Sequence, residues 1–173
     1  MAIQKVPIEV DITYTNQSWS TGHKRKDTSK HYVIGFYQRD KTGTAIIKTI
    51  PDNNPETIIK AIYENVAKGS IIYSEENLLP EDLVDDYDIY ELMPSDGHAN
   101  GDLHINNVKN MWKDLKRCIK REHVQVSKKH LQSYCNEVAW RINHRHLSPS
   151  EKFNALFGAM ARAGKCTFQD LVK

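Results

Sequence analysis

PIEVDITYT, residues 7–15, alternates apolar and polar side chains along its whole length. A period of two is typical of a β-strand that buries at least one of its faces. Asp11 stands near the middle of this predicted strand, on the polar face. The apolar face carries Ile8, Val10, Ile12 and Tyr14, and the polar face carries Glu9, Asp11 and Thr13.

The segments that follow predict a β-hairpin. HYVIGFYQ (31–38) and TAIIKTI (44–50) are rich in β-branched and aromatic residues, and they flank the sequence DKTG (40–43). A short connection with Asp and Gly between two such runs is a strong hairpin signal. Ahead of the hairpin, residues 16–30 form a polar, basic loop.

A helix and two further strands come next. Asn54 can cap the helix, Pro55 suits its first position and Gly69 ends it. SIIYSE (70–75) is apolar enough to lie inside a sheet, and DIYELMP (88–94) predicts a fifth strand. The expected buried stripe of the helix consists of Ile58, Ile59, Ile62, Tyr63 and Val66.

The remainder of the chain has a helical pattern. Apolar residues recur at helical spacing over 105–119 and again over 127–142. SPSE (148–151) is a capping box with Pro at the first helical position, and it opens a third helix. We expect residues 148–173 to be a helical extension that packs on the same domain as residues 1–147.

The order of these elements predicts a mixed α/β sheet of the RNase H type. Three strands would form an antiparallel meander, and a crossover helix would then lead to a parallel central strand. The expected fold is therefore a five-stranded mixed sheet with flanking helices and further C-terminal helices. Other α+β arrangements satisfy the same order of elements.

The composition excludes several classes of protein. A chain of 173 residues, 39% hydrophobic and 27% charged, is long enough for one soluble domain with a core. No apolar run reaches membrane-spanning length, and the first residues lack the pattern of a signal peptide. Cys118, Cys135 and Cys166 form no CxxC pair, which excludes a zinc ribbon and argues against a disulfide framework. We expect an intracellular protein that is neither secreted nor bound to a membrane.

The net charge of +2 conceals a segregation of charge along the chain. Residues 75–91 contain eight acids and no Lys or Arg, whereas residues 104–130 contain eight bases against Asp114 and Glu122. A basic face of this kind fits a polyanion. Equally, the acidic and basic surfaces can attract each other, and charge alone does not choose between the two. The bases are Lys109, Lys113, Lys116, Arg117, Lys120, Arg121, Lys128 and Lys129.

An RNase H-type sheet suggests a particular chemistry. Nucleases and strand-transferases of this type hold two metal ions with carboxylates from strand 1, a central strand and a later helix. Asp11 lies in strand 1, and Glu75 ends the strand after the crossover helix. A third acid would fit 34 positions after Glu75, but that residue is Lys109.

From Ile8 to about Arg145 the chain resembles the catalytic domain of insertion-sequence DDE transposases, the ISXO2-like group related to Merlin elements. The family's pattern is VDETY, an IYTDE-like segment, HTNxIExFWSxLKR and a VSxKHLxxY helix that ends in RxNxR. The last two blocks are long and specific. The matching segments are VDITY (10–14), GSIIYSEE (69–76), GDLHINNVKNMWKDLKR (101–117) and VSKKHLQSYCNEVAWRINHR (126–145).

The resemblance implies three metal-ligand positions, two of which depart from the pattern. Asp11 retains the first, Glu75 replaces an expected Asp, and Lys109 replaces an expected Glu. The longer arm of Glu75 misplaces a ligand for Mg²⁺, which demands near-octahedral geometry. Lys109 puts a cation where two divalent cations would bind, and each repulsive contact at ~4 Å costs several kcal/mol at an effective dielectric of ~20.

The match implies further site residues and further departures. Some members are described by an Asn and a downstream Lys in the same helix, and Asn106 and Lys116 hold those places. Ile12 replaces the acid that usually follows the first Asp, and Pro80 stands where an aromatic is usual. We therefore expect no bound metal and no cofactor. Asp11 and Glu75 would be the ligands if a metal binds, and Mg²⁺ would be the ion if the protein is active.

Other candidate side chains have plainer interpretations. Cys135 and Trp112 lie at helical spacing among apolar residues, which favours core positions over a nucleophile and a base-stacking platform. His144 and His146 fall at a helix end, where imidazole and carbonyl groups match well, so a metal site is not favoured there. Trp19, in the polar loop, is the better surface aromatic.

The leading hypothesis is a transposase-derived, catalytically weakened or inactive pseudoenzyme that binds nucleic acid, partner proteins or both. The nucleic acid is DNA by resemblance, with RNA as the alternative. The zinc-ribbon and helix-turn-helix segments that family members carry ahead of this domain are expected to be absent, which favours a domesticated subunit. The rivals are an active Mg²⁺-dependent strand-transferase that uses Asp11, Glu75 and Asn106, with Glu76 as a further candidate, and a purely structural interaction subunit. The expected nucleic-acid surface consists of Lys24, Arg25, Lys26, Lys113, Lys116, Arg117, Lys120, Arg121, Lys128 and Lys129.

Overall fold

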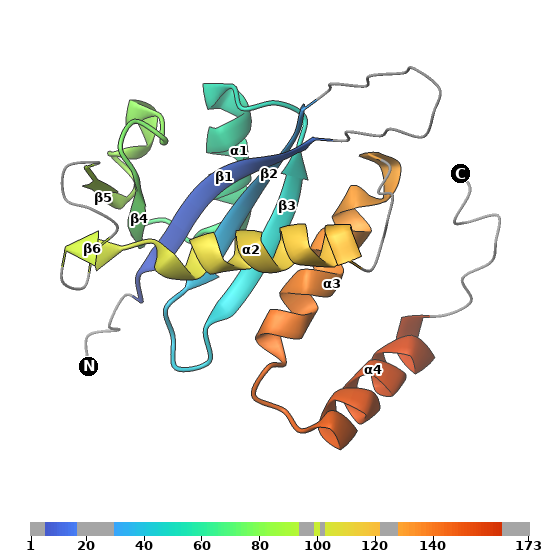
Figure 1. Ribbon diagram of the computed structural model, residues 1–173. Helices are drawn as coiled ribbons and strands as arrows, with labels where there is room; N and C mark the ends of the chain where they lie inside the picture. Colours follow the sequence, from blue (N-terminus) through green and yellow to red (C-terminus); the bar gives the residue numbers. More distant parts are fainter. Residues whose placement is uncertain (1–5, 17–29, 94–98, 101–102, 122–127, 164–173) are drawn as a thin grey trace, which may run out of the picture. The chain divides into compact units, whose positions relative to one another are not determined.

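The structure, a computed structural model, divides the chain into two compact units, Met1–Asn143 and His144–Lys173 (Figure 1). It describes residues 6–16, 30–93, 99–100, 103–121 and 128–163. The larger unit holds the sheet and the first three helices, and the smaller unit holds α4. Each unit is described by itself below.

The larger unit is built on a five-stranded mixed sheet with the strand order β3-β2-β1-β4-β5. β1, β2 and β3 pair antiparallel, whereas β4 runs parallel to both β1 and β5. This is the predicted class: a meander, a crossover and a parallel central strand. The strands are β1 Ile8–Asn16, β2 Lys30–Gln38, β3 Thr44–Ile50, β4 Ile71–Glu75 and β5 Asp88–Leu92.

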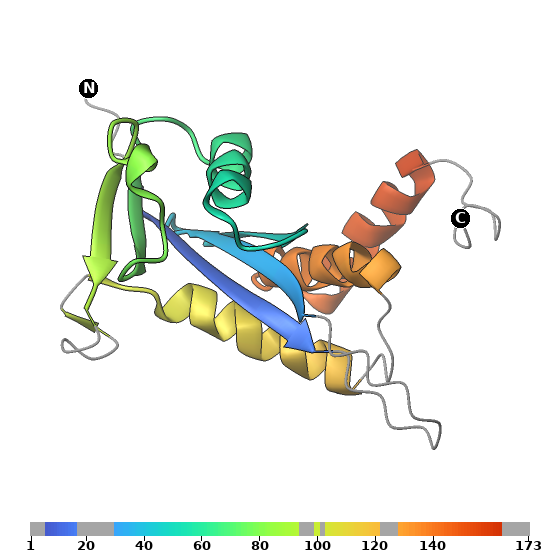
Figure 2. The same ribbon diagram turned by 90° about the horizontal axis from the view of Figure 1, so that it is seen from above.

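Helices cover both faces of this sheet (Figure 2). α1, Pro55–Asn65, lies on one face, and α2, Asn106–Arg121, and α3, Leu131–Asn143, lie on the other. The 3₁₀ turns η1, Glu81–Leu83, and η3, Lys128–His130, complete the described connections. A short two-stranded ladder, β6 Ala99–Asn100 with β7 Leu103–His104, precedes α2.

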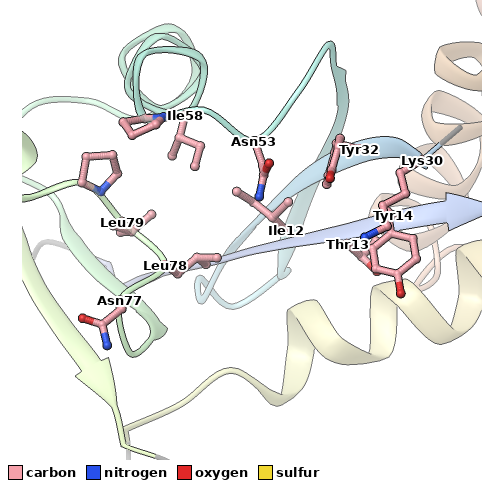
Figure 3. Close-up of a pocket in the computed structure, with 12 residues that line it drawn as sticks. Ile12, Thr13, Tyr14, Lys30, Tyr32, Asn53, Ile58, Asn77, Leu78 and Leu79 are labelled. Carbon is pink, nitrogen blue, oxygen red and sulfur yellow. The ribbon is translucent and has the colours of Figure 1, made fainter.

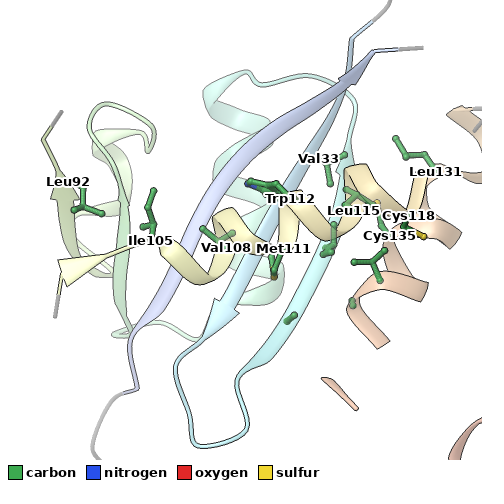
Figure 4. Packing of buried hydrophobic residues seen from close by; sticks show 14 residues of the cluster. Val33, Leu92, Ile105, Val108, Met111, Trp112, Leu115, Cys118, Leu131 and Cys135 are labelled. Carbon is green, nitrogen blue, oxygen red and sulfur yellow. The ribbon is translucent and has the colours of Figure 1, made fainter. Parts of the chain in front are cut away.

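Each face of the sheet has its own hydrophobic core. The face toward α1 packs Val10, Ile34 and Ile72 of the strands against Ile58 and Ile62 of the helix. The opposite core is larger, and its sheet side chains meet the apolar stripes predicted for the two later helices (Figure 4). It includes Val33, Ala45, Ile47, Val108, Met111, Trp112, Leu115, Leu131, Cys135 and Val138.

Helices cover both faces of β1, so burial of its polar side chains costs free energy. Ile8, Val10 and Ile12 belong to the α1 core, as the alternation predicts. Glu9 is fully buried and Asp11 is only 3% exposed, both on the face that α2 covers. Because a buried carboxylate without partners is expensive, these two side chains require specific contacts.

The start and stripe of α1 differ from the expectation. Asn54 occupies the N-cap position, but its side chain makes no capping hydrogen bond. Asp52 holds the turn before the helix, since it accepts hydrogen bonds from Asn54 N and Thr57 Oγ1. Tyr63 is 41% exposed rather than buried, and its hydroxyl donates a hydrogen bond to Asp86, whereas Ala61 is buried.

The β2–β3 connection confirms the predicted hairpin. Asp40 accepts hydrogen bonds from Thr42 N, Thr42 Oγ1 and Gly43 N. Gly43 has φ 67°, a left-handed conformation that glycine adopts without steric cost. Asp40 therefore accepts the hydrogen bonds of the turn, and Gly43 provides its left-handed conformation.

The smaller unit contains α4, Pro149–Ala163, whose start has the predicted capping box. Ser148 N and Ser148 Oγ donate to Glu151 Oε2, and Glu151 N donates back to Ser148 Oγ. Phe153 and Phe157 stack with ring centroids 6.2 Å apart. The packing of residues 148–173 on the larger domain stays a prediction. Within the described residues, none of the helices has the length and apolarity needed to cross a membrane.

Candidate functional site

The parallel pair β1 and β4 brings two carboxylates together at the edge of its ladder. The recorded pairs are Ile8 with Ile72 and Glu9 with Tyr73. The two strands separate beyond that point, so Asp11 and Glu75 lie two residues further along on each strand. Their side chains meet on the face that α2 covers, as the sequence predicted.

Lys109 of α2 lies between these two acids. Its Nζ atom donates a hydrogen bond to Glu75 Oε1 and lies 3.6 Å from Asp11 Oδ2. The Lys109 side chain is 37% exposed and that of Glu75 49%, whereas that of Asp11 is only 4% exposed. The lysine therefore enters from the solvent side and neutralises a buried carboxylate beneath it.

Both oxygens of Asp11 already have hydrogen-bond donors. Ile12 N donates to Oδ1 at 2.9 Å, and the Trp112 indole Nε1 donates to Oδ2 at 2.8 Å. Gly35, which faces Asp11 across the β1–β2 ladder, makes room for that indole. A Cβ atom at Gly35 would lie 2.5 Å from Trp112 Cη2 and 2.8 Å from Met111 Cε.

Burial and the neighbouring lysine act on Asp11 in opposite directions. Burial raises the pKa of the Asp11 carboxyl above its usual 3.8, although the Lys109 charge and the Trp112 hydrogen bond partly offset this rise. Burial also lowers the pKa of Lys109, but the hydrogen bond to Glu75 and the charge of Asp11 outweigh it, so the net pKa is raised. Lys109 therefore carries its charge at neutral pH.

A second buried carboxylate, Glu9, anchors the start of α2 on β1. Glu9 Oε1 accepts hydrogen bonds from Arg39 Nε at 2.6 Å and Asn107 Nδ2 at 2.7 Å. Glu9 Oε2 accepts one from Val108 N at 2.9 Å, which satisfies a backbone donor in the first turn of the helix. A negative charge is favourable at this end of a helix dipole. Lys109 is the next residue, so this contact fixes its position.

Arg39 links Glu9 to the segment that precedes α2. Its Nη2 atom lies 2.7 Å from His104 Nδ1 and donates to the His104 carbonyl, while its guanidinium stacks 4.6 Å from the Tyr73 ring centroid. Arginine cannot accept a hydrogen bond, so His104 Nδ1 must be the acceptor. The 3.3 Å contact between His104 Nδ1 and Glu9 is then not an ion pair.

The described members of the predicted basic surface lie on the outer side of α2 and on η3. Lys113, Lys116, Arg117 and Lys120 are exposed on α2, and Lys128 and Lys129 are exposed on η3. Arg121 ends α2, but its side chain lies outside the described part of the structure. Lys24, Arg25 and Lys26 fall in residues 17–29, which are also outside it, as are Trp19 and Cys166.

Four lysines of α2 form a stripe that begins at the acid pair. Lys109, Lys113, Lys116 and Lys120 are spaced by three or four residues, so they lie along one side of the helix. Lys116 lines a pocket with Thr13 and Thr15, which places the stripe beside the second half of β1. Asn106, one turn before Lys109, is exposed at the start of α2.

The acid pair lies at the end of the β1–β4 ladder, and α2 crosses it. These features allow a comparison with known protein families. Comparison with known protein families matches residues 5–143 to the ISXO2-like transposase domain. The chain belongs to the ISXO2-like transposase domain family. The match covers the sheet and the three helices of the larger unit. No curated protein sequence and no solved structure matches this chain.

The donor groups of this transposase domain do not fit the two-metal site that its family implies. Two divalent cations need several oxygen ligands, whereas Asp11 and Glu75 meet an ammonium group here. Among the described residues there is no group of three or more His, Cys, Asp or Glu side chains suited to a metal ion. Both Asp11 oxygens are also engaged by nitrogen donors.

Sequence reasoning missed several residues that position the acid pair in this transposase domain. Trp112 was predicted as a core residue and is one, but its indole N–H also holds Asp11. The signal for that contact was Gly35, since a glycine inside a strand often marks a close approach. The Glu9–Arg39 pair had no short-range signal, because its partners are 30 residues apart.

Cys135 has the predicted structural role. Its side chain is fully buried between α3 and the sheet, and burial raises the pKa of its thiol to about 12. The thiol therefore keeps its proton at neutral pH. A protonated, inaccessible sulfur is not a nucleophile.

Proposed function

We propose that this transposase-derived domain binds nucleic acid through the basic surface of α2 and η3, and that its acid site is catalytically weakened or inactive. DNA is the proposed ligand, and the domain would act as a domesticated subunit with partner proteins. The observation that supports the loss of catalysis most directly is the Lys109 ammonium group between Asp11 and Glu75. The Lys109 ammonium group competes with a metal ion for the place between the two acids.

The repulsion between Lys109 and a divalent cation at this place amounts to several kcal/mol. Lys109 Nζ contacts both acids, so a divalent cation at the same place must displace it or bear its repulsion. At an effective dielectric of about 20, each contact of two unit charges at ~4 Å amounts to roughly 4 kcal/mol, and a divalent ion doubles it. The Lys109 charge therefore opposes a divalent cation at the acid pair by several kcal/mol, which supports the lysine as the occupant of this place.

The basic surface supports the nucleic-acid part of the proposal. Lys116 and Lys120 make no ion pair with another described residue, and neither does Lys128 or Lys129. Their charges therefore remain available to phosphates. Arg117 pairs with Asp114 at the rim of this surface, an exposed contact that a phosphate can replace at little cost.

The decisive experiment compares the natural chain with a double variant that restores the family's acids, Glu75→Asp with Lys109→Glu. Nicking of supercoiled plasmid in Mg²⁺ or Mn²⁺ and calorimetric titration of Mg²⁺ are the two measurements. We expect the natural chain to be inactive and to bind no Mg²⁺ at the acid pair, and the double variant to bind it. The triple variant that adds Asp11→Asn is the matched control and should lose that binding.

Two outcomes would change the assignment. Nicking by the natural chain that Asp11→Asn abolishes would make it an active strand-transferase of the family. Failure of the natural chain to bind either DNA or RNA in a salt-dependent way would favour the purely structural rival, because phosphate contacts release counterions and give a steep salt dependence.

A further inference from the structure

A groove follows the open edge of β1 beyond the acid pair (Figure 3). Its larger part is a pocket of about 440 Å³ between β1, the approach to α1 and residues 77–80. Its smaller part, of about 380 Å³, lies between the end of β1 and α2 and is lined by Lys116 and Ile119. Thr13 and Tyr14 line both parts.

The groove exists because β4 leaves β1. The β1–β4 ladder is recorded only for Ile8 and Glu9 of β1, whereas β1 continues to Asn16. After Glu75 the chain turns through Asn77, whose φ of 56° is in the left-handed region. The second half of β1 therefore has β2 on one side and no described strand on the other.

Tyr14 lines both parts of the groove, and its neighbouring side chains determine which chemical groups it can bind. Its side chain is 45% exposed although it belongs to the central strand of the sheet. Tyr32 supports it with an edge-to-face contact of 6.5 Å between ring centroids, and Lys30 Nζ lies 4.9 Å from its centroid. Lys116 lines the smaller part of the groove together with Tyr14. Tyr14 therefore presents a partly exposed aromatic ring with two lysines, Lys30 and Lys116, in its surroundings.

We propose that this groove binds an unpaired nucleotide of a nucleic-acid strand, with its base stacked on Tyr14 and the adjoining phosphates near Lys30 and Lys116. The inference deepens the proposed function, on which it rests, by adding a single-strand site to the basic duplex-binding surface. A pocket of about 440 Å³ falls in the range of roughly 300–1,000 Å³ that holds small-molecule ligands. Base–aromatic stacking with a cationic groove is the general way in which proteins hold unpaired strands.

The lining charges favour a nucleotide over a peptide. An open strand edge can also accept a peptide as an added strand. However, neither pocket has an acidic side chain among its described lining residues, and both have a lysine. Lys116 of the lysine stripe lines the smaller part, so a strand that follows the stripe along α2 reaches the groove at Tyr14.

The test compares two fluorescein-labelled probes, a short oligothymidylate strand and a blunt DNA duplex, by anisotropy at several salt concentrations. Tyr14→Ala is expected to weaken binding of the single strand about 10-fold, in line with the loss of one stacked base, and to leave duplex binding unchanged. Tyr14→Phe should retain single-strand affinity, because stacking needs the ring and not the hydroxyl. Tyr90→Ala removes a tyrosine that is 52% exposed on β5 and serves as the matched control.

The salt dependence distinguishes the stacking contact with the base from the ionic contacts with the phosphates. Tyr14→Ala should leave the salt slope for the single strand unaltered, whereas Lys30→Ala should reduce it by about one phosphate contact. Equal binding of the single strand by Tyr14→Ala and the natural chain would overturn the groove while leaving the proposed function intact. Absence of salt-dependent binding to both probes would overturn both proposals together. Equal losses on the two probes would show that Tyr14 contacts duplex and not an unpaired base.

Discussion

Lys109 is the residue on which the electrostatics of the acid pair depends. Its ammonium group compensates the ionised form of Asp11, which burial disfavours. Trp112 is the second support, because its indole N–H stabilises the same charge. Removing either support leaves a buried carboxylate with fewer partners, and such a group responds by holding its proton to higher pH.

The variant Lys109→Met should raise the pKa of Asp11 further and make stability more pH-dependent. A folded-state pKa above the unfolded value means that the free energy of unfolding falls as pH rises through the window between the two. That window starts near the usual 3.8 of Asp and extends higher in the variant. At pH 7 we expect a loss of about 1–2 kcal/mol, smaller than for a buried pair since Lys109 is 37% exposed.

Denaturant unfolding at several pH values checks this expectation. The loss should shrink toward pH 3, where Asp11 is protonated with or without the lysine. Lys113→Met, one turn along the same helix and exposed, is the matched control and should show no comparable pH dependence. A loss in Lys109→Met that is the same at every pH would contradict the electrostatic account.

Gly35→Ala should destabilise the domain by about 1–3 kcal/mol, the usual cost of overpacking a core. The added Cβ would lie 2.5 Å from the Trp112 ring, so the indole must move away from Asp11. We expect the NMR signal of the Trp112 indole N–H to shift and the pKa of Asp11 to rise. Gly158→Ala in α4 is the control, since a Cβ there meets only the flexible Arg162 side chain at 3.4 Å. That change should be neutral or stabilising in a helix.

Helix α2 contributes residues to both the acid site and the basic nucleic-acid surface. Its first turn is fixed to β1 by Glu9, its inner side packs into the hydrophobic core on the sheet, and its outer side carries the lysine stripe. The position of Lys109 therefore depends on a contact made by its neighbour Val108. Loss of that contact should loosen the beginning of the helix before it affects the end.

Glu9→Gln should cost about 2–4 kcal/mol. The amide keeps one acceptor, but its NH₂ group must face either Arg39 and Asn107 or Val108 N, all of which are donors, and the charge that pairs with Arg39 is lost. Hydrogen exchange should rise most at the start of α2, and denaturant unfolding gives the total. Glu137→Gln, in an exposed i,i+4 pair with Arg141, should cost no more than about 0.5 kcal/mol. Similar losses in the two variants would argue against the anchoring role of Glu9.

Elements with strong periodicity could be predicted from the sequence, and the contacts between them could not. The strands and the three later helices follow from alternation, helical spacing and the SPSE box, because local side-chain patterns determine them. The side-chain cap expected of Asn54 is not formed, and Asp52 instead accepts hydrogen bonds from Asn54 N and Thr57 Oγ1, a detail that depends on the local turn. The clamp of Glu9 by Arg39 joins two strands at their ends, and nothing in either segment alone indicates it.

The candidate site was predictable to a similar degree. The convergence of Asp11, Glu75 and Lys109 follows from strand order together with the family resemblance. The hydrogen bond from Trp112 was not predicted, because helical spacing identifies the buried side of a helix and not the direction of an indole N–H. Tyr14 was assigned to the buried face with Ile12, but the departure of β4 leaves it 45% exposed.

Within the larger unit, two segments carry opposite charge: residues 75–91 are acidic and helix α2 is basic. The acidic segment 75–91 and the basic helix α2 are joined by the Lys109–Glu75 ion pair. Lys116 and Lys120, further along α2, make no ion pair with a described acid. This distribution supports an outward-facing basic surface over a fully self-neutralised one, although a partner molecule's acidic surface remains the rival ligand.

Reversal of three charges on α2 decides between these ligands. The variant Lys116→Glu, Arg117→Glu, Lys120→Glu should lose most DNA affinity, and its salt slope should fall by about 0.9 for each phosphate contact removed. The control variant Lys41→Glu, Lys48→Glu, Lys60→Glu changes the net charge equally at exposed positions outside α2, so it should retain the slope. Phosphate contacts position a duplex without reading its bases, and the loss should therefore be the same for unrelated DNA sequences. DNA binding that survives the α2 reversal with an unaltered slope would place the nucleic acid elsewhere, and the α2 surface would then be the docking site for an acidic protein partner.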